Sequence, residues 1–123
     1  MKVIGNFGTR VGKILVAARY AQVDLQQEDF YPRTASEEAL KEFKKKNPNA
    51  KIPVLETPEG SIYESNAILR YVARLSKGAK IYGANKWEEA QVDQYLDWAS
   101  TLLEPALFGF QGQIVGWTAA TEQ

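Results

Sequence analysis

The chain of 123 residues contains no cysteine and no histidine. Without cysteine there is no disulfide framework and no thiol redox centre. Without histidine there are no imidazole ligands for zinc, and no catalytic triad that depends on an imidazole base. Any thiol chemistry must therefore act on a thiol that the substrate brings, and we expect no resident metal ion.

The sequence also lacks an excess of one charge, because 15 Lys and Arg residues balance 15 Asp and Glu residues. The densest basic run, residues 44–46, closes a predicted helix, where cations interact favourably with the helix dipole. Neither nucleic acid nor an anionic membrane is therefore expected as a main partner. No apolar stretch approaches the ~20 residues of a membrane span, and no apolar signal region opens the chain, so we expect a cytoplasmic protein.

Hydrophobic residues make up 45% of the chain, which is ordinary for a protein with a buried core. Their spacing predicts a β-α-β-α-β-β-α order over residues 1–76. The predicted strands are 2–7, 23–25, 51–57 and 61–64, and the predicted helices are 10–21, 34–46 and 65–76. A strand, helix and strand in succession predict a parallel pair, and the turn at 58–60 predicts a hairpin. The result is an α/β domain with one mixed sheet.

Two pairs of residues have the spacing of a helix-capping box, in which a polar side chain precedes a glutamate by three positions. Thr34 with Glu37 is predicted to start the second helix, and Asn85 with Glu88 the last one. The last helix, 87–107, has an apolar stripe made of Val92, Tyr95, Leu96, Ala99, Leu102, Leu103 and Ala106. Leaving that stripe exposed would forgo ~10–20 kcal/mol of burial, so it must pack against something. From Phe108 onward we predict no regular element.

The segment KIPVLETPEGSIYESNAILRYV, residues 51–72, and the order of elements before it resemble the glutathione transferase superfamily. The resemblance covers roughly residues 1–105, includes QVDQYLDWAS at 91–100, and is closest to the amino-terminal domain of the gamma subunit of eukaryotic elongation factor 1. It implies a thioredoxin-like domain at 1–76, a linker at 77–84, and at 85–123 the first helix and tail of a truncated all-α domain. The family dimerises through this helix, so we expect a fragment that forms a homo-oligomer through residues 87–107.

The resemblance also implies a binding site for glutathione. A cis peptide bond between Ile52 and Pro53 would turn the backbone of Ile52 outward to pair with the tripeptide, whereas a trans bond would simply begin an edge strand. Ser65, at the expected helix N-cap, would receive the γ-glutamyl carboxylate, and Glu64 would receive the ammonium group. Lys51 would offset the glycyl carboxylate. The alternatives are that Ser65 only caps its own helix and that Lys51 is only an exposed lysine.

Catalysis would need a group that lowers the pKa of the glutathione thiol. Family enzymes use a Tyr, Ser or Cys near the end of the first strand, and that region here reads GNFGTRVGK. Thr9 is its only hydroxyl, and Arg10 would add positive charge at the start of a helix. The alternative for Arg10 is an ordinary solvated arginine.

Three functions therefore remain open at the level of sequence. The resemblance favours a noncatalytic scaffold of the elongation factor 1 complex, which holds the nucleotide-exchange subunit and sometimes aminoacyl-tRNA synthetases. The second is an active glutathione transferase that uses Thr9 and Arg10. The third is a dimerisation module with a vestigial pocket.

Overall fold

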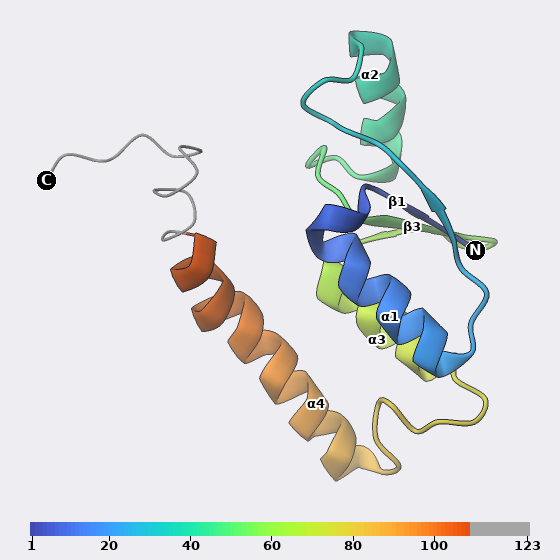
Figure 1. Ribbon diagram of the computed structural model, residues 1–123, viewed down its shortest axis with the longest axis vertical. Helices are drawn as coiled ribbons and strands as arrows, with labels where there is room; N and C mark the ends of the chain where they lie inside the picture. The colour runs from blue at the N-terminus through green and yellow to red at the C-terminus, as the bar shows by residue number, and fades with distance from the viewer. Residues whose placement is uncertain (109–123) are drawn as a thin grey trace, which may run out of the picture. The chain divides into compact units, whose positions relative to one another are not determined.

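The computed structural model of the protein describes residues 1–108, apart from the side chain of Thr9. Of the irregular tail predicted from Phe108, all but Phe108 itself lies outside the described residues. The chain divides into two compact units, the first Met1–Tyr82 and the second beginning at Gly83. The first unit holds the sheet and three helices, and the second holds a long helix (Figure 1).

The first unit contains a mixed four-stranded sheet. Its strands are β1 (Lys2–Ile4), β2 (Gln26–Glu28), β3 (Val54–Thr57) and β4 (Gly60–Tyr63). They lie in the order β2-β1-β3-β4, with β1 parallel to β2 and antiparallel to β3, and with β3 antiparallel to β4. The predicted βαβ unit and the predicted hairpin are both present, so the fold class inferred from the sequence is confirmed.

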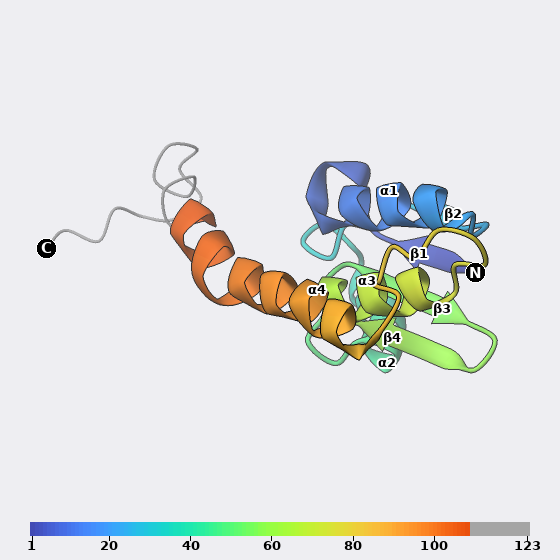
Figure 2. The same ribbon diagram turned by 90° about the horizontal axis from the view of Figure 1, so that it is seen from below.

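The two faces of the sheet carry separate cores, because neighbouring residues of a strand point to opposite faces. Val3 and Leu55 pack with helices α1 (Gly12–Ala21) and α3 (Ser65–Arg74). On the other side, Ile4 and Val54 pack with Phe43 of α2 (Glu37–Lys46), whose ring stacks on Phe30 at 4.3 Å between centroids. Helices α1 and α3 thus cover one face, and α2 covers the other (Figures 1 and 2).

The second strand begins three residues later than predicted. Helix α1 ends at Gln22, which adopts a left-handed conformation (φ 56°), and the Val23 N–H donates to the Ala18 carbonyl at 2.9 Å. Residues 23–25 therefore carry the chain away from the helix, and Val23 and Leu25 pack at the edge of the core. Pairing with β1 starts only at Gln26, so the prediction of a strand at 23–25 is wrong.

The N-cap of helix α2 likewise lies two residues after Thr34, the predicted cap. Its N-cap is Ser36, whose Oγ accepts a hydrogen bond from the Ala39 N–H at 3.2 Å. Thr34 Oγ1 instead donates to the Tyr31 carbonyl at 3.5 Å. Thr34 and Ser36 both carry a hydroxyl that can cap a helix. After the turn at residues 32–34, Ser36 has the extended backbone conformation that an N-cap requires.

The second unit confirms the other capping pair. Asn85 Oδ1 accepts from the N–H groups of Trp87 and Glu88 at 3.0 and 3.1 Å, and the Glu88 carboxylate accepts from Asn85 Nδ2 at 3.0 Å. Helix α4 (Lys86–Trp98) begins there and continues through the π-helical turn η2 (Ala99–Leu103) to residue 108. Within residues 1–108, no helix is long and apolar enough to cross a lipid bilayer.

Hydroxyl side chains accompany the π-helical turn of the second unit. Ser100 Oγ lies 3.2 Å from the Leu96 carbonyl and 3.0 Å from the Asp97 carbonyl, and Thr101 Oγ1 donates to Asp97 at 2.9 Å. Hydroxyls that bond back to helix carbonyls compete with the backbone N–H groups and often bend a helix. The predicted helix 87–107 is therefore present, with a widened turn inside it.

Candidate functional site

The strand register brings three distant parts of the sequence to one end of the sheet. Ile4 lies opposite Val54, and Val54 lies opposite Tyr63, so these residues form a row across β1, β3 and β4. The next residue outward is Gly5 after β1, Pro53 before β3 and Glu64 after β4. The segments that carry the predicted site residues therefore start from the same end of the sheet.

Gly5 lets two of these segments approach closely. A Cβ at Gly5 would lie 2.9 Å from Val11 Cγ2 and 3.0 Å from the Ile52 Cβ, closer than side-chain carbons normally come. Its φ of +134° is also one that residues with a side chain rarely adopt. The π-helical turn η1 (Phe7–Val11), which leads from β1 into α1, and the segment before β3 thus meet across a glycine.

The peptide bond between Ile52 and Pro53 is cis, as the resemblance implied. Ile52 is half-buried and packs against the core cluster of Ile4, Phe43 and Val54. Lys51, the residue before it, is exposed. A half-buried apolar side chain and an exposed cation are thus adjacent immediately before β3.

Glu64 and Ser65 mark the start of α3, with one correction. The N-cap is Glu64, which has a positive φ of 70° with ψ 116°, and its side chain makes no capping hydrogen bond. The prediction of Ser65 as the cap is wrong by one position, because Ser65 already has helical geometry and is buried, with 8% of its surface exposed. Ser65 therefore lies in the first turn, where backbone N–H groups have no partner within the helix.

Lys13 joins the first turns of α1 and α3. Its Nζ donates to Asn66 Oδ1 at 2.8 Å, across 53 positions of sequence. Sequence analysis did not identify either residue, since a lysine on a helix and an asparagine after a serine carry no local signal of such a contact. The amino-terminal ends of both helices are therefore held at the same end of the sheet as Gly5 and Ile52.

Residues 1–74 match the family described as Glutathione S-transferase, N-terminal domain. This chain belongs to that family. The match spans all four strands, the cis bond and α3, so the N-terminal domain of a glutathione S-transferase accounts for nearly the whole first unit.

Known proteins similar to this glutathione S-transferase-like chain fall into two groups. The "Probable elongation factor 1-gamma 1" of Arabidopsis thaliana is 39% identical over 106 residues, which are 85% of this chain and 25% of the relative. Solved structures include glutathione transferase F2 from Populus trichocarpa, with a TM-score of 0.76, 27% identity, and coverage of 85% of this chain and 50% of that one. The chain thus spans about a quarter of the elongation factor relative.

A second solved structure is described with its ligand. The theta class glutathione S-transferase of Xanthomonas axonopodis pv. citri was solved with glutathione bound. Its TM-score to this chain is 0.70 at 26% identity, over 82% of this chain and 48% of that one. The similarity concerns the fold that carries Ile52, Glu64 and Ser65 here.

The two residues predicted for catalysis belong to η1, the turn that follows β1. Arg10 is partly buried in the last turn of η1, and it interacts with at least one neighbouring group. The side chain of Thr9 lies outside the described residues. The assignment of Thr9 and Arg10 to catalysis stays a prediction.

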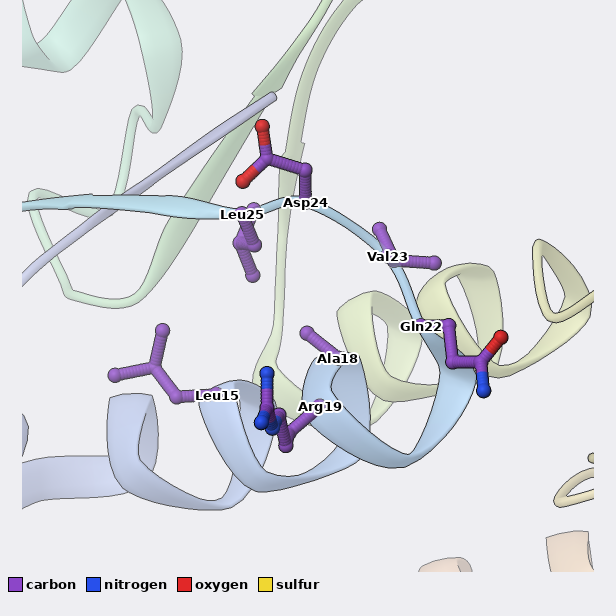
Figure 3. Close-up of a pocket in the computed structure, with 7 residues that line it drawn as sticks. All are labelled: Leu15, Ala18, Arg19, Gln22, Val23, Asp24 and Leu25. Atoms are coloured by element: carbon purple, nitrogen blue, oxygen red, sulfur yellow. The ribbon is translucent and has the colours of Figure 1, made fainter.

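A cavity at the other end of α1 contains none of the predicted site residues. Its volume is about 690 Å³, and it lies between the last turns of α1 and the segment that leads to β2 (Figure 3). It is lined by Leu15, Ala18, Arg19, Gln22, Val23, Asp24 and Leu25. In the described range, no three His, Cys, Asp or Glu side chains are grouped so as to hold a metal ion.

Proposed function

We propose that this protein is the glutathione S-transferase-like portion of an elongation factor 1-gamma, and that it retains a glutathione site. The observation that carries the glutathione site is the row Ile4, Val54 and Tyr63, which brings the segments of Ile52 and Glu64 together. The elongation factor assignment rests on the similarity to a gamma subunit over 85% of this chain.

The proposed site recognises the two ends of glutathione separately. Glu64 pairs with the ammonium group of the γ-glutamyl end, and the carboxylate of that end accepts from Ser65 Oγ and the first N–H groups of α3. The partial positive charge at the start of a helix favours that carboxylate. At the other end, the backbone of Ile52 pairs with the tripeptide and Lys51 offsets its glycyl carboxylate.

Calorimetric titration with glutathione tests the site directly. Ser65→Ala removes one donor to a charged group, a hydrogen bond of about 1.5–3 kcal/mol, so the Kd should rise at least tenfold. Ser61→Ala, an exposed serine of β4 in the same hairpin, is the matched control and should leave the Kd unchanged. Wild-type protein that binds no glutathione at millimolar concentration would refute the site.

A second candidate is an active transferase, favoured by the position of η1 at the same end of the sheet. The glutathione thiol has a pKa near ~8.5, and lowering it by ~2 units takes ~2.7 kcal/mol of preference for the thiolate. One hydrogen bond to a charged acceptor supplies about 1.5–3 kcal/mol, so the Thr9 hydroxyl would suffice, with the charge of Arg10 in support.

Conjugation of glutathione to a chloronitrobenzene separates the two candidates. Binding without turnover supports the scaffold. Turnover that Thr9→Ala abolishes, with glutathione binding intact, supports the enzyme. Thr34→Ala, at an exposed threonine before α2, controls for the loss of a hydroxyl in general.

The remaining partners follow from the same proposal. As a gamma-type subunit, the protein would act in the cytoplasm within the elongation factor 1 complex and bind the nucleotide-exchange subunit, with aminoacyl-tRNA synthetases as further partners. Titration of the purified exchange subunit tests this interaction, and a Kd weaker than millimolar would count against it. Homo-oligomers through residues 87–107 would show as a concentration-dependent sedimentation coefficient, whereas a monomer throughout would exclude them.

A further inference from the structure

Asn47 is a buried polar residue that closes the loop between α2 and β3. Only 2% of its surface is exposed. Its backbone N–H donates to the Phe43 carbonyl at 3.1 Å, and its carbonyl accepts from the Ala50 N–H at 2.9 Å. Its side-chain Nδ2 donates to the Lys51 carbonyl at 2.6 Å, and Oδ1 accepts from the Asn49 N–H at 3.0 Å. One residue thus bonds to both ends of its own loop.

The chemistry of the partners fixes the orientation of this amide. The carbonyl of Lys51 only accepts hydrogen bonds, and the N–H of Asn49 only donates them, so Nδ2 and Oδ1 cannot exchange places. A buried amide that loses a partner is strongly disfavoured. The Asn47 side chain therefore holds the carbonyl of Lys51 at one position relative to the end of α2.

The backbone between these two residues has an unfavourable conformation. Ala50 has φ 51°, in the left-handed region that residues with a Cβ seldom adopt. Such a conformation persists only where surrounding bonds impose it. Here the hydrogen bonds of Asn47 to Ala50 and Lys51 impose it. The loop is therefore held in one conformation directly before Lys51 and Ile52.

We propose that Asn47 is a positioning residue for the glycyl half of the glutathione site. Its amide holds the carbonyl of Lys51, and so orients the Lys51 side chain and the backbone of Ile52 that the site uses. Asn47 is buried and does not touch the ligand. The inference rests on the proposed function, and it concerns the end of the ligand remote from Glu64 and Ser65.

The test compares two ligands in Asn47→Asp, which keeps the shape and the acceptor but puts an oxygen in place of Nδ2. Glutathione should bind at least about tenfold more weakly, a change of about 1.4 kcal/mol. The dipeptide γ-glutamylcysteine lacks the glycyl end, so its Kd should change less than about twofold. A role in stability alone would weaken both ligands equally.

The matched control is Tyr82→Phe, which also removes a side-chain hydrogen bond of a buried residue. Arg74 Nη2, at the carboxyl end of α3, donates to the hydroxyl of the buried Tyr82 at 2.9 Å. This variant should lose stability while both ligands keep their Kd. If it changes the ratio of the two Kd values as Asn47→Asp does, the positioning role is wrong.

The outcomes separate this inference from the function on which it rests. Wild-type protein that binds neither ligand refutes the glutathione site and the inference with it. Wild-type binding with an unchanged ratio of Kd values in Asn47→Asp refutes the positioning role alone. If the variant does not fold, amide hydrogen exchange of the wild-type protein provides the test. Glutathione should slow the exchange of the Asn49 and Ala50 amides more than γ-glutamylcysteine does. Equal slowing by the two ligands would overturn the positioning role.

Discussion

Replacement of Gly5 by alanine should destabilise the first unit far more than the same change at Gly60 or Gly78 of that unit. The new Cβ would lie 2.9 Å from Val11 Cγ2 and 3.0 Å from the Ile52 Cβ, and φ is +134°. Unfavourable backbone geometry costs about 1–3 kcal/mol, and overpacking of a filled site costs about 1–3 kcal/mol more. The expected loss is therefore about 2–6 kcal/mol.

Two other glycines separate these two costs. Gly60 has φ +145° but no atom within 4 Å of an added Cβ, so Gly60→Ala should cost only the backbone part, about 1–3 kcal/mol. Gly78 has open space as well and no positive φ. Gly78→Ala should change stability by less than about 1 kcal/mol, in the stabilising direction if at all, because alanine restricts the unfolded chain.

Urea denaturation, followed by the circular dichroism of the helices, measures the three variants. A unit that spans Met1–Tyr82 is expected to be stable by about 4–12 kcal/mol, so Gly5→Ala should lower the midpoint strongly or leave the unit unfolded. The order of stability should be Gly78→Ala, then Gly60→Ala, then Gly5→Ala. Equal losses at Gly5 and Gly60 would refute the argument that Val11 and Ile52 leave no room for a side chain.

Three further predictions concern charge, capping and the loop before the cis bond. Hydrogen bonds from Lys46, and then from Lys2, lower the pKa of Glu56 from its ordinary 4.5, so the stability that it contributes is complete above pH 4.5 and is lost as pH falls through the lower folded value. Acid titration of the free energy of unfolding should show that loss in wild type and not in Glu56→Gln. Asn85→Ala should lower the helix content of the second unit and cost about 0.5–2 kcal/mol, measured by circular dichroism and urea titration, because two N–H groups lose their acceptor. Ala50→Gly, unlike most alanine-to-glycine changes, should not lower the melting temperature, because φ at that position is 51°; a drop of several degrees would contradict the strain.

Local patterns predicted the parts of the fold that depend on single elements. The apolar pairs Val3-Ile4 and Val54-Leu55 predicted strands, and in the structure each pair supplies one residue to each core. The spacing of Ile68 and Val72 predicted a helix with a buried stripe. These predictions held because the periodicity of burial is a property of the element itself.

The sequence predicted only some of the residues that form the proposed site. The resemblance singled out Ile52-Pro53 and Glu64-Ser65 as candidates for the proposed site, because their signal lies in adjacent residues. It did not single out Gly5, where an added Cβ would lie 2.9 Å from Val11 Cγ2, or Asn47, whose proposed role depends on a hydrogen bond of 2.6 Å to the Lys51 carbonyl. The start of α2 was wrong for a related reason, since two neighbouring hydroxyls have equal capping ability until the chain has turned.

The sequence by itself determined the order of the elements, the faces that they bury and the absence of a thiol or imidazole in the chain. Each of these follows from residue type and from spacing along one segment. Only the tertiary structure decided that Lys13 meets Asn66, that β2 starts at Gln26, and that Asn47 holds Lys51. Such contacts depend on strand register and helix packing, which are set by the whole core and leave no mark in the local sequence.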